Sequence, residues 1–247
     1  MEEKARLVFF DFCETLIKYQ TADKYIDFCR EILCYKQMNF LQMIVSVLTK
    51  LRFFRIAGFF ISSDVVRKKI ILYQLKNIDY YTLDRLAKEY YQQCLKPSII
   101  YPIMERLLSH LQSGDEVWIV SGGYDMYIKY FVEEYGLAGY IATNIAFTDS
   151  GICMGTFRGL DCMRSNKVIL IKKKFGDMLD IVDTIAYSDS KSDLPLLLMV
   201  KDGYVISKNK SQMKYSGKLM RHWYWCIFLT LMLLVLTAVV LYINTLA

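Results

Sequence analysis

Residues 6–16 of the chain read Arg-Leu-Val-Phe-Phe-Asp-Phe-Cys-Glu-Thr-Leu. The four consecutive apolar residues from Leu7 to Phe10 are typical of a short strand that is buried on both faces of a parallel sheet. Asp11 follows this strand directly. Because ligands of open α/β sheets bind beyond the carboxyl ends of the strands, Asp11 is a candidate functional residue. The stretch therefore predicts a fold class and one site residue together.

The rest of the chain alternates strand-like with helix-like segments, which predicts an α/β fold with a parallel sheet. The region between about residues 22 and 97 is helix-rich throughout. It is too long for a simple crossover helix, so we expect an inserted helical domain there. Further strands are predicted at residues 116–120, about 140–144, 184–187 and 204–207, and helices at 102–112, 126–134, 167–175 and 194–200.

Composition excludes several classes of protein. With 54% hydrophobic and 15% aromatic residues in 247, the chain is neither disordered nor collagen-like. The net charge of +6 comes without a zinc-spaced Cys/His set or an Arg-rich run, so nucleic acid is not an expected partner. Seven scattered cysteines favour reduced thiols. Since His110 and His222 are the only histidines, the chemistry is expected to depend on carboxylates.

Residues 223–243 contain no charged residue and would span about 30 Å as a helix, the thickness of a bilayer core. This length predicts one transmembrane helix and disfavours the alternative, a buried helix of a soluble domain. A basic linker, residues 208–222, precedes the span, while the four residues after it are uncharged. By the positive-inside rule we expect a single-pass membrane protein whose larger part lies in the cytoplasm. The linker can also contact anionic lipid headgroups.

Polar residues follow the predicted strands at four places. Asp11 is the first, Ser121 the second, Lys167 opens a helix at the third, and Asp189 and Asp193 form the fourth. Each alone is more often a helix cap, a turn residue or a surface lysine. Together they supply carboxylates for a divalent cation, an ammonium group to neutralise phosphate, and a hydroxyl to hold phosphate oxygens.

In order and spacing these segments resemble the four motifs of the haloacid dehalogenase-like superfamily. Residues 121–124 (Ser-Gly-Gly-Tyr) and 189–195 (Asp-Ser-Lys-Ser-Asp-Leu-Pro) resemble its phosphoserine-phosphatase-type branch in particular. The resemblance covers about residues 6–207. It implies a Rossmann-like catalytic core built from residues 1–20 and 98–207, with residues 21–97 forming a helical cap over the active site.

The resemblance also implies phosphatase chemistry through an aspartyl-phosphate. Asp11 would attack phosphorus, Lys167 would offset the negative charge, and Asp193 would orient Lys167 or a metal-bound water. The implied residues fall into three sets: catalytic Asp11, Cys13 and Lys167; phosphate-binding Ser121, Gly122 and Lys167; and, for Mg²⁺, Asp11, the backbone carbonyl of Cys13, Asp189 and Asp193.

Cys13 departs from the family pattern, which has an aspartate there as general acid and base. A thiol among carboxylates should stay protonated, so it could donate a proton but would be a poor base. Several interpretations stay open. Cys13 acts as a weaker acid, or the leaving group needs no proton, or the chain is a slow enzyme, a phosphotransferase or a catalytically impaired pseudophosphatase. A decayed site with a buried thiol is the simplest alternative.

Two features concern the substrate. Gln20 stands where phosphoserine phosphatases carry a glutamate for the substrate amino group, which makes phosphoserine a doubtful substrate. Residues 39–60 are apolar and basic, which suits either a helix in the membrane interface or a cap helix packed on its neighbours. We therefore expect a membrane-anchored, Mg²⁺-dependent phosphomonoester phosphatase. Its substrate would be a phosphorylated small molecule or a lipid- or prenyl-linked phosphate.

Overall fold

The computed structural model describes residues 5–33 and 64–206. The predicted transmembrane helix at 223–243, the basic linker at 208–222 and the apolar, basic segment at 39–60 lie outside these described residues. Within the described part of the chain, no helix combines the length and the apolar character needed to cross a bilayer.

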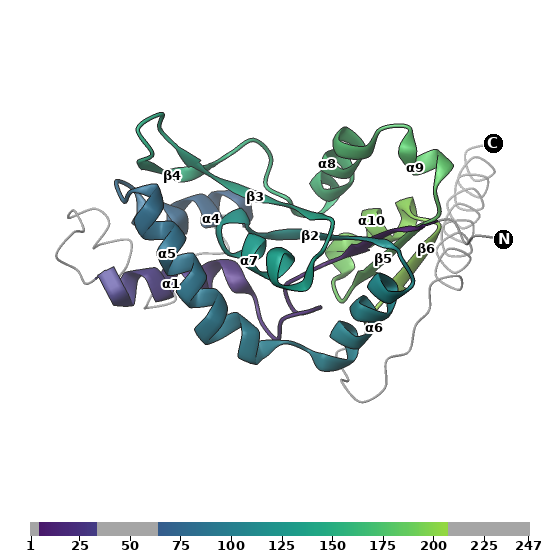
Figure 1. The fold of residues 1–247 in the computed structure, drawn as a ribbon. Coiled ribbons are helices and arrows are strands. Elements are labelled where there is room, and N and C mark those ends of the chain that lie inside the picture. The colour runs from purple at the N-terminus through teal and green to yellow at the C-terminus, as the bar shows by residue number, and fades with distance from the viewer. Residues whose placement is uncertain (1–4, 34–63, 207–247) are drawn as a thin grey trace, which may run out of the picture.

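A mostly parallel sheet of six strands forms the centre of the described part (Figure 1). The strand order is β4-β3-β2-β1-β5-β6, and only β3 and β4 pair antiparallel. Since β1 lies between β2 and β5, the residue that follows β1 lies at the middle of the sheet's carboxyl edge. The strands are β1 (Leu7–Phe10), β2 (Glu116–Tyr124), β3 (Gly139–Phe147), β4 (Cys153–Arg158), β5 (Thr184–Ser188) and β6 (Asp202–Val205).

The α/β prediction is confirmed, and all five predicted strands are present, with β1 at the predicted bounds. Strand β4 is not among the predicted strands. Its side chains alternate between buried Cys153 and Phe157 and exposed Met154 and Arg158, as in an edge strand with one face in water. This strand pairs antiparallel with the C-terminal half of β3, so the sheet is not purely parallel.

Helices cover both faces of the sheet. Val8 and Phe10 point into a core shared with α6 and α7, whereas Leu7 and Phe9 point into a second core with α8 and α10. The alternation follows from the two-residue period of a strand and explains why β1 is apolar throughout. The covering helices are α6 (Tyr101–Gln112), α7 (Asp125–Tyr135), α8 (Ser165–Phe175), α9 (Met178–Ile181) and α10 (Leu194–Met199).

Residues 21–33 and 64–98, which lie between β1 and α6, form helices beyond the carboxyl edge of the sheet (Figure 1). We call this part the helical insertion. Its longer helices are α1 (Thr21–Leu33), α4 (Asp64–Leu72) and α5 (Tyr80–Tyr90). A short helical turn, Tyr73–Leu75, follows α4, and two more, Tyr91–Leu95 and Lys96–Ser98, follow α5.

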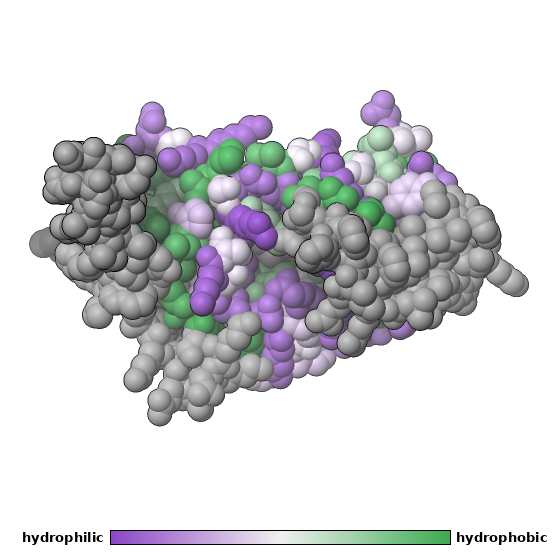
Figure 2. All heavy atoms as spheres, turned by 180° about the vertical axis from the view of Figure 1, so that it is seen from behind, coloured by the Kyte–Doolittle hydropathy of each residue, from purple (hydrophilic) through white to green (hydrophobic). Residues whose placement is uncertain are grey.

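Buried aromatic rings join the helical insertion to the sheet domain. The rings of Tyr25 and Tyr90 lie 5.2 and 5.4 Å from that of Tyr127 on α7. The β3–β4 hairpin adds a backbone hydrogen bond from Cys153 to the carbonyl of Ile78 (2.8 Å). Figure 2 shows the face opposite to that of Figure 1, on which hydrophilic and hydrophobic side chains are mixed between the grey segments. The helical insertion and the sheet domain therefore share one apolar core, and both position the site between them.

Candidate active site

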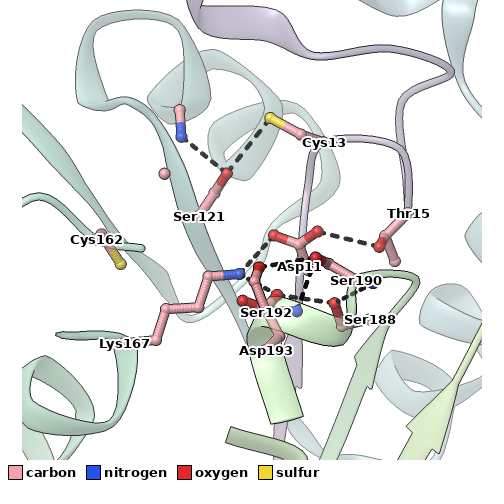
Figure 3. Close-up of polar contacts among 12 residues, drawn as sticks. Asp11, Cys13, Thr15, Ser121, Cys162, Lys167, Ser188, Ser190, Ser192 and Asp193 are labelled. Carbon is pink, nitrogen blue, oxygen red and sulfur yellow. Dashed lines mark hydrogen bonds and ion pairs between the residues drawn. The ribbon is translucent and has the colours of Figure 1, made fainter. Parts of the chain in front are cut away.

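Asp11 lies at the end of β1, where the sheet holds both its backbone and its carboxylate. Its amide N–H donates to the carbonyl of Tyr187 on β5 (2.9 Å). Its side chain is buried, with Oδ1 accepting from Lys167 Nζ (2.7 Å) and Oδ2 accepting from Thr15 Oγ1 (3.1 Å) (Figure 3). The carboxylate therefore has a fixed orientation toward the cavity described below.

Lys167 reaches the same point from the first turn of α8. Its Nζ also donates to Asp193 Oδ2 (2.5 Å), and this carboxylate accepts a further hydrogen bond from Ser188 Oγ (2.7 Å). Burial by itself lowers the pKa of Lys167, but the charges of Asp11 and Asp193 outweigh burial and raise it. The ammonium group therefore stays charged and can balance negative charge at Asp11.

Thr15 links Asp11 to a third carboxylate. Its Oγ1 lies 3.1 Å from Asp189 Oδ1 as well, and one hydroxyl proton can serve only one of these carboxylates fully at a time. Burial raises the pKa of Asp11 to about 6, opposed by Lys167 and reinforced by Asp193 and Asp189. Two carboxylates thus contact the ammonium group and a third lies beside them, so the negative charges outnumber the positive charge in this group of four residues.

This donor set fits Mg²⁺ better than a metal held entirely by side chains. Among residues 5–33 and 64–206, no group of three or more His, Cys, Asp or Glu side chains is arranged to hold a metal ion. Mg²⁺ is usually bound by one or two carboxylates, with waters and substrate phosphate completing the octahedron. Asp11 and Asp189 would supply those carboxylates, and Asp193 is directed at Lys167, so its role as a metal ligand stays a prediction.

Ser121 and Gly122 line the cavity as well, and Gly123 follows them in β2. Ser121 Oγ accepts from the amide N–H of Gly123 (3.0 Å), which leaves the hydroxyl proton to donate to a ligand oxygen. A Cβ on Gly122 would lie 2.6 Å from the Cγ of Met163, and one on Gly123 would lie 2.7 Å from the hydroxyl of Tyr127. The close packing explains why these two positions at the end of β2 are glycines.

Cys13 lies beside Ser121, away from Thr15 (Figure 3). Its Sγ is 3.8 Å from Ser121 Oγ and 3.1 Å from the hydroxyl of Thr21, which in turn is 2.6 Å from the hydroxyl of Tyr127. Burial raises the pKa of Cys13, and the charge of Asp11 raises it further. A protonated thiol at neutral pH, as expected from the sequence, agrees with this environment.

A cavity of about 490 Å³ opens between the helical insertion and the sheet. Every site residue predicted from the sequence lines it: Asp11, Cys13, Ser121, Gly122, Lys167, Asp189 and Asp193. The mouth is more mixed in charge, with Asp23 and Arg67 forming an ion pair (3.1 Å). Four separate segments of the sequence therefore meet at one cavity of a size suited to a small phosphorylated molecule.

Three polar residues of this region, Thr15, Lys68 and Ser188, are not among the residues predicted from the sequence. Thr15 and Ser188 are close in sequence to the predicted residues Cys13 and Asp189, and this proximity is the signal that could have identified them. In the structure their hydroxyls donate to Asp11 and Asp193. Lys68, which also lines the cavity, carried no such signal. It comes from α4, and its partners are 54 to 93 residues away in sequence.

Comparisons with known proteins agree with this architecture. The chain is 27% identical over 135 residues to a histidinol-phosphatase of Neisseria meningitidis, a match that covers 51% of this chain and 60% of the relative. A crystal structure of a protein of unknown function from Bordetella pertussis superposes with a TM-score of 0.70 at 20% identity, covering 83% of this chain and 91% of that one.

A phospho-aspartyl intermediate analogue of phosphoserine phosphatase superposes with a TM-score of 0.53 at 17% identity, covering 90% of this chain and 99% of that one. At such identities the solved structures establish the fold. The chain spans about three fifths of the length of the histidinol-phosphatase that it matches. A family model for haloacid dehalogenase-like hydrolases matches residues 8–198, more than half of the sequence. The chain therefore belongs to the haloacid dehalogenase-like hydrolase family.

Proposed function

We propose that this protein is a Mg²⁺-dependent phosphatase that hydrolyses a phosphomonoester through an aspartyl-phosphate on Asp11. The observation that carries the proposal is the buried Asp11 carboxylate, held between Lys167 and Thr15 at a cavity whose other wall is Ser121 and Gly122. A fixed nucleophile opposite phosphate-binding donors is the arrangement that phosphoryl transfer requires.

In the first step an Asp11 oxygen forms a bond to phosphorus while the bond from phosphorus to the leaving oxygen breaks. Ser121 Oγ–H and the amide of Gly122 bind the phosphoryl oxygens, and Lys167 offsets their charge. A water then attacks phosphorus, releasing inorganic phosphate and restoring the Asp11 carboxylate. A bound Mg²⁺ would supply positive charge at the phosphoryl oxygens, held by Asp11, the carbonyl of Cys13 and Asp189.

The proton for the leaving oxygen is the step for which the family aspartate is absent. The Cys13 thiol lies beside Ser121 and can donate that proton, but a thiol is a poor base toward water. This favours a substrate whose leaving group needs little protonation, such as a phosphoanhydride or a sugar 1-phosphate. A phosphotransferase or a pseudophosphatase is the second candidate, carried by the same residue.

The mouth of the cavity argues against phosphoserine. The Gln20 amide, which donates from Nε2 to Glu14 Oε2 (2.5 Å), is uncharged and therefore cannot form an ion pair with a substrate ammonium. We propose further that a helix at 223–243 anchors the protein in a membrane with the catalytic part in the cytoplasm. The substrate class would then include lipid- and prenyl-linked phosphates.

Phosphate release by the detergent-solubilised protein tests the activity. It should be measured with and without Mg²⁺ on amino-acid, sugar, nucleotide, lipid and prenyl phosphates, with Asp11→Asn as the matched control. We expect Mg²⁺-dependent release that is lost in Asp11→Asn. No release from any substrate by a folded protein would favour the binding-only alternative, and phosphate transfer to an added alcohol would favour the phosphotransferase.

Membrane anchoring is tested separately by removing residues 208–247. We expect the shortened protein to leave the membrane fraction. Continued membrane binding would instead point to residues 39–60, and a full-length protein found only in the soluble fraction would contradict the anchor.

A further inference from the structure

A buried lysine reaches the site from the helical insertion. Lys68 lies on α4, with 5% of its surface exposed, and its Nζ donates to three acceptors. These are the carbonyl of Gly122 (2.5 Å), Oγ1 of Thr143 (3.0 Å) and Oδ1 of Asp161 (2.5 Å). All three belong to the sheet domain. The three N–H groups of the ammonium are therefore each directed at an acceptor outside the insertion.

The first acceptor connects Lys68 to the proposed phosphate-binding hydroxyl. The Gly122 carbonyl belongs to the peptide whose N–H is that of Gly123, and this N–H donates to Ser121 Oγ (3.0 Å). Lys68 holds one end of the peptide plane and Ser121 the other. Because hydrogen bonds in a chain polarise one another, the ammonium also strengthens the hydrogen bond to Ser121. The Ser121 proton is thereby left aimed away from the peptide.

The other two acceptors connect Lys68 to the segment that precedes Lys167. Thr143 Oγ1 accepts from the amide of Cys162 (3.1 Å), and the Asp161 carbonyl accepts from Asn166 Nδ2 (3.0 Å). Among the described residues, Oδ2 of Asp161 has no hydrogen-bond partner, while Oδ1 accepts from Lys68 and also from the hydroxyl of Thr143 (2.7 Å). One ammonium group thus holds both segments that face a bound phosphate.

Stability alone does not explain this arrangement. A buried ion pair contributes little beyond what a well-packed apolar pair would contribute, because both charges lose their hydration. The acceptor on Gly122 is not part of that pair, and an apolar residue could not hold it. The cavity-lining position and the Gly122 contact together indicate a role in the site.

We propose that Lys68 is a positioning residue. It fixes the Gly122–Gly123 peptide, and through it the Ser121 hydroxyl, so that phosphate binding requires α4 to be packed on the sheet domain. This inference rests on the proposed role of Ser121 in binding phosphate. Lys68 acts through Ser121 and not by direct contact with the phosphoryl group, since its three N–H groups are already engaged.

A double-mutant cycle on the full-length protein in Mg²⁺ tests this inference. The dissociation constant of inorganic phosphate is measured by calorimetry for wild type, Lys68→Met, Ser121→Ala and the double variant. We expect Lys68→Met to weaken binding on the order of 10- to 100-fold. In the Ser121→Ala background the same change should weaken binding less than about 2-fold, since coupled residues are not additive. Lys69→Met, an exposed neighbour on α4, is the matched control and should bind as wild type.

Three outcomes would overturn the inference. Unchanged phosphate affinity in Lys68→Met would do so, as would independent effects of the two substitutions, which indicate direct contact. Wild type that binds no phosphate would overturn the proposed function as well. If Lys68→Met does not fold, Lys68→Met with Asp161→Asn removes both buried charges together. That variant should fold and show the same loss of affinity, and wild-type affinity in it would contradict the inference.

Discussion

Two buried polar clusters in the sheet domain differ in how their charges are balanced. The Asp11 cluster, made of Asp11, Lys167, Asp189 and Asp193, has three carboxylates around one ammonium group and lines the cavity. Burial and the neighbouring carboxylates raise the pKa of Asp11 to about 6, although Lys167 lowers it. The negative charges of this cluster therefore outnumber its positive charge.

The Asp115 cluster, made of Arg6, Arg106, His110, Asp115 and Tyr187, lies between α6 and the sheet and has matched donors and acceptors. Arg6 donates to both carboxylate oxygens of Asp115 (2.9 and 2.7 Å), which also lies 2.7 Å from His110 Nδ1. His110 Nε2 is 2.9 Å from the hydroxyl of Tyr187, which accepts from Arg106 Nε (3.1 Å). Neutral His110, donating from Nδ1 and accepting at Nε2, satisfies every step.

This difference in charge balance indicates that the Asp115 cluster serves stability and the Asp11 cluster serves the site. Where a buried network is fully matched, it fixes one arrangement of helix and sheet, and its loss should lower stability. Where like charges lie close together beside a cavity, their repulsion lowers the stability of the folded protein, but it favours binding of a ligand of opposite charge. Variants in the two clusters should therefore divide into those that change the free energy of unfolding and those that change catalysis.

Lys167→Met should show the largest effect, because it leaves Asp11 and Asp193 buried without a counter-charge. We expect kcat/KM to fall about 10³-fold and the free energy of unfolding at pH 8 to fall by about 3–5 kcal/mol. The raised pKa of Asp11 should rise further, so the variant should recover stability relative to wild type as pH falls from 8 to 5. Urea unfolding at several pH values, without Mg²⁺, measures this, and a pH-independent difference would contradict it.

Asp115→Asn should act on stability alone. The amide cannot accept charge-assisted hydrogen bonds from Arg6 and His110, so we expect a loss of about 2–3 kcal/mol in the free energy of unfolding. Activity per folded molecule should stay within about 2-fold of wild type. Asp183→Asn, which removes an exposed ion pair with Lys201, is the control and should change stability by less than about 1 kcal/mol. Impaired turnover in folded Asp115→Asn would contradict this prediction, because it would show that the Asp115 cluster also affects catalysis.

Cys13→Asp tests whether the Asp11 cluster lacks only its proton shuttle. If the rest of the site is assembled, turnover of an alkyl phosphate should rise about 10- to 100-fold, since general acid–base catalysis contributes about 10²–10⁴. Cys13→Ser, which restores no carboxylate, should not show this gain. Steady-state phosphate release compares the three proteins. No gain in folded Cys13→Asp would support the pseudophosphatase alternative.

The smallest expected effect concerns His110. Burial lowers the pKa of His110, and the charges of Arg106 and Arg6 lower it further, although Asp115 raises it. The unfolded chain therefore binds the proton first, and stability should fall as pH decreases from about 6.5 toward the lower pKa of the folded state. His110→Gln should lose this dependence, by up to about 1 kcal/mol between pH 7.5 and 5.5. Parallel pH dependence in both proteins would contradict this, because it would mean that the pKa of His110 is the same in the folded and unfolded states.

Local patterns were sufficient for five of the six strands of the sheet and for the motif residues. In an apolar run such as Leu7–Phe10, the side chains on both faces of the strand are buried. A few neighbouring residues are therefore enough to predict the strand. Asp11 and Ser121 could be predicted because each directly follows an apolar run, and Lys167 because it opens a helical pattern, near the edge where a parallel sheet gathers its polar groups. The strand β4 was not predicted because its alternating run is short, and its extended structure depends on pairing with β3.

The sequence by itself determined the α/β class, the order of four polar segments and the absence of the usual aspartate at Cys13. These depend on side-chain period and on spacing along the chain. Only the tertiary structure decided that Lys68 reaches Gly122 and that Asp115 is matched by Arg6 and His110. Such contacts join residues far apart in sequence, and they form because burial forces each polar group to find a partner within hydrogen-bond distance, wherever in the chain that partner lies.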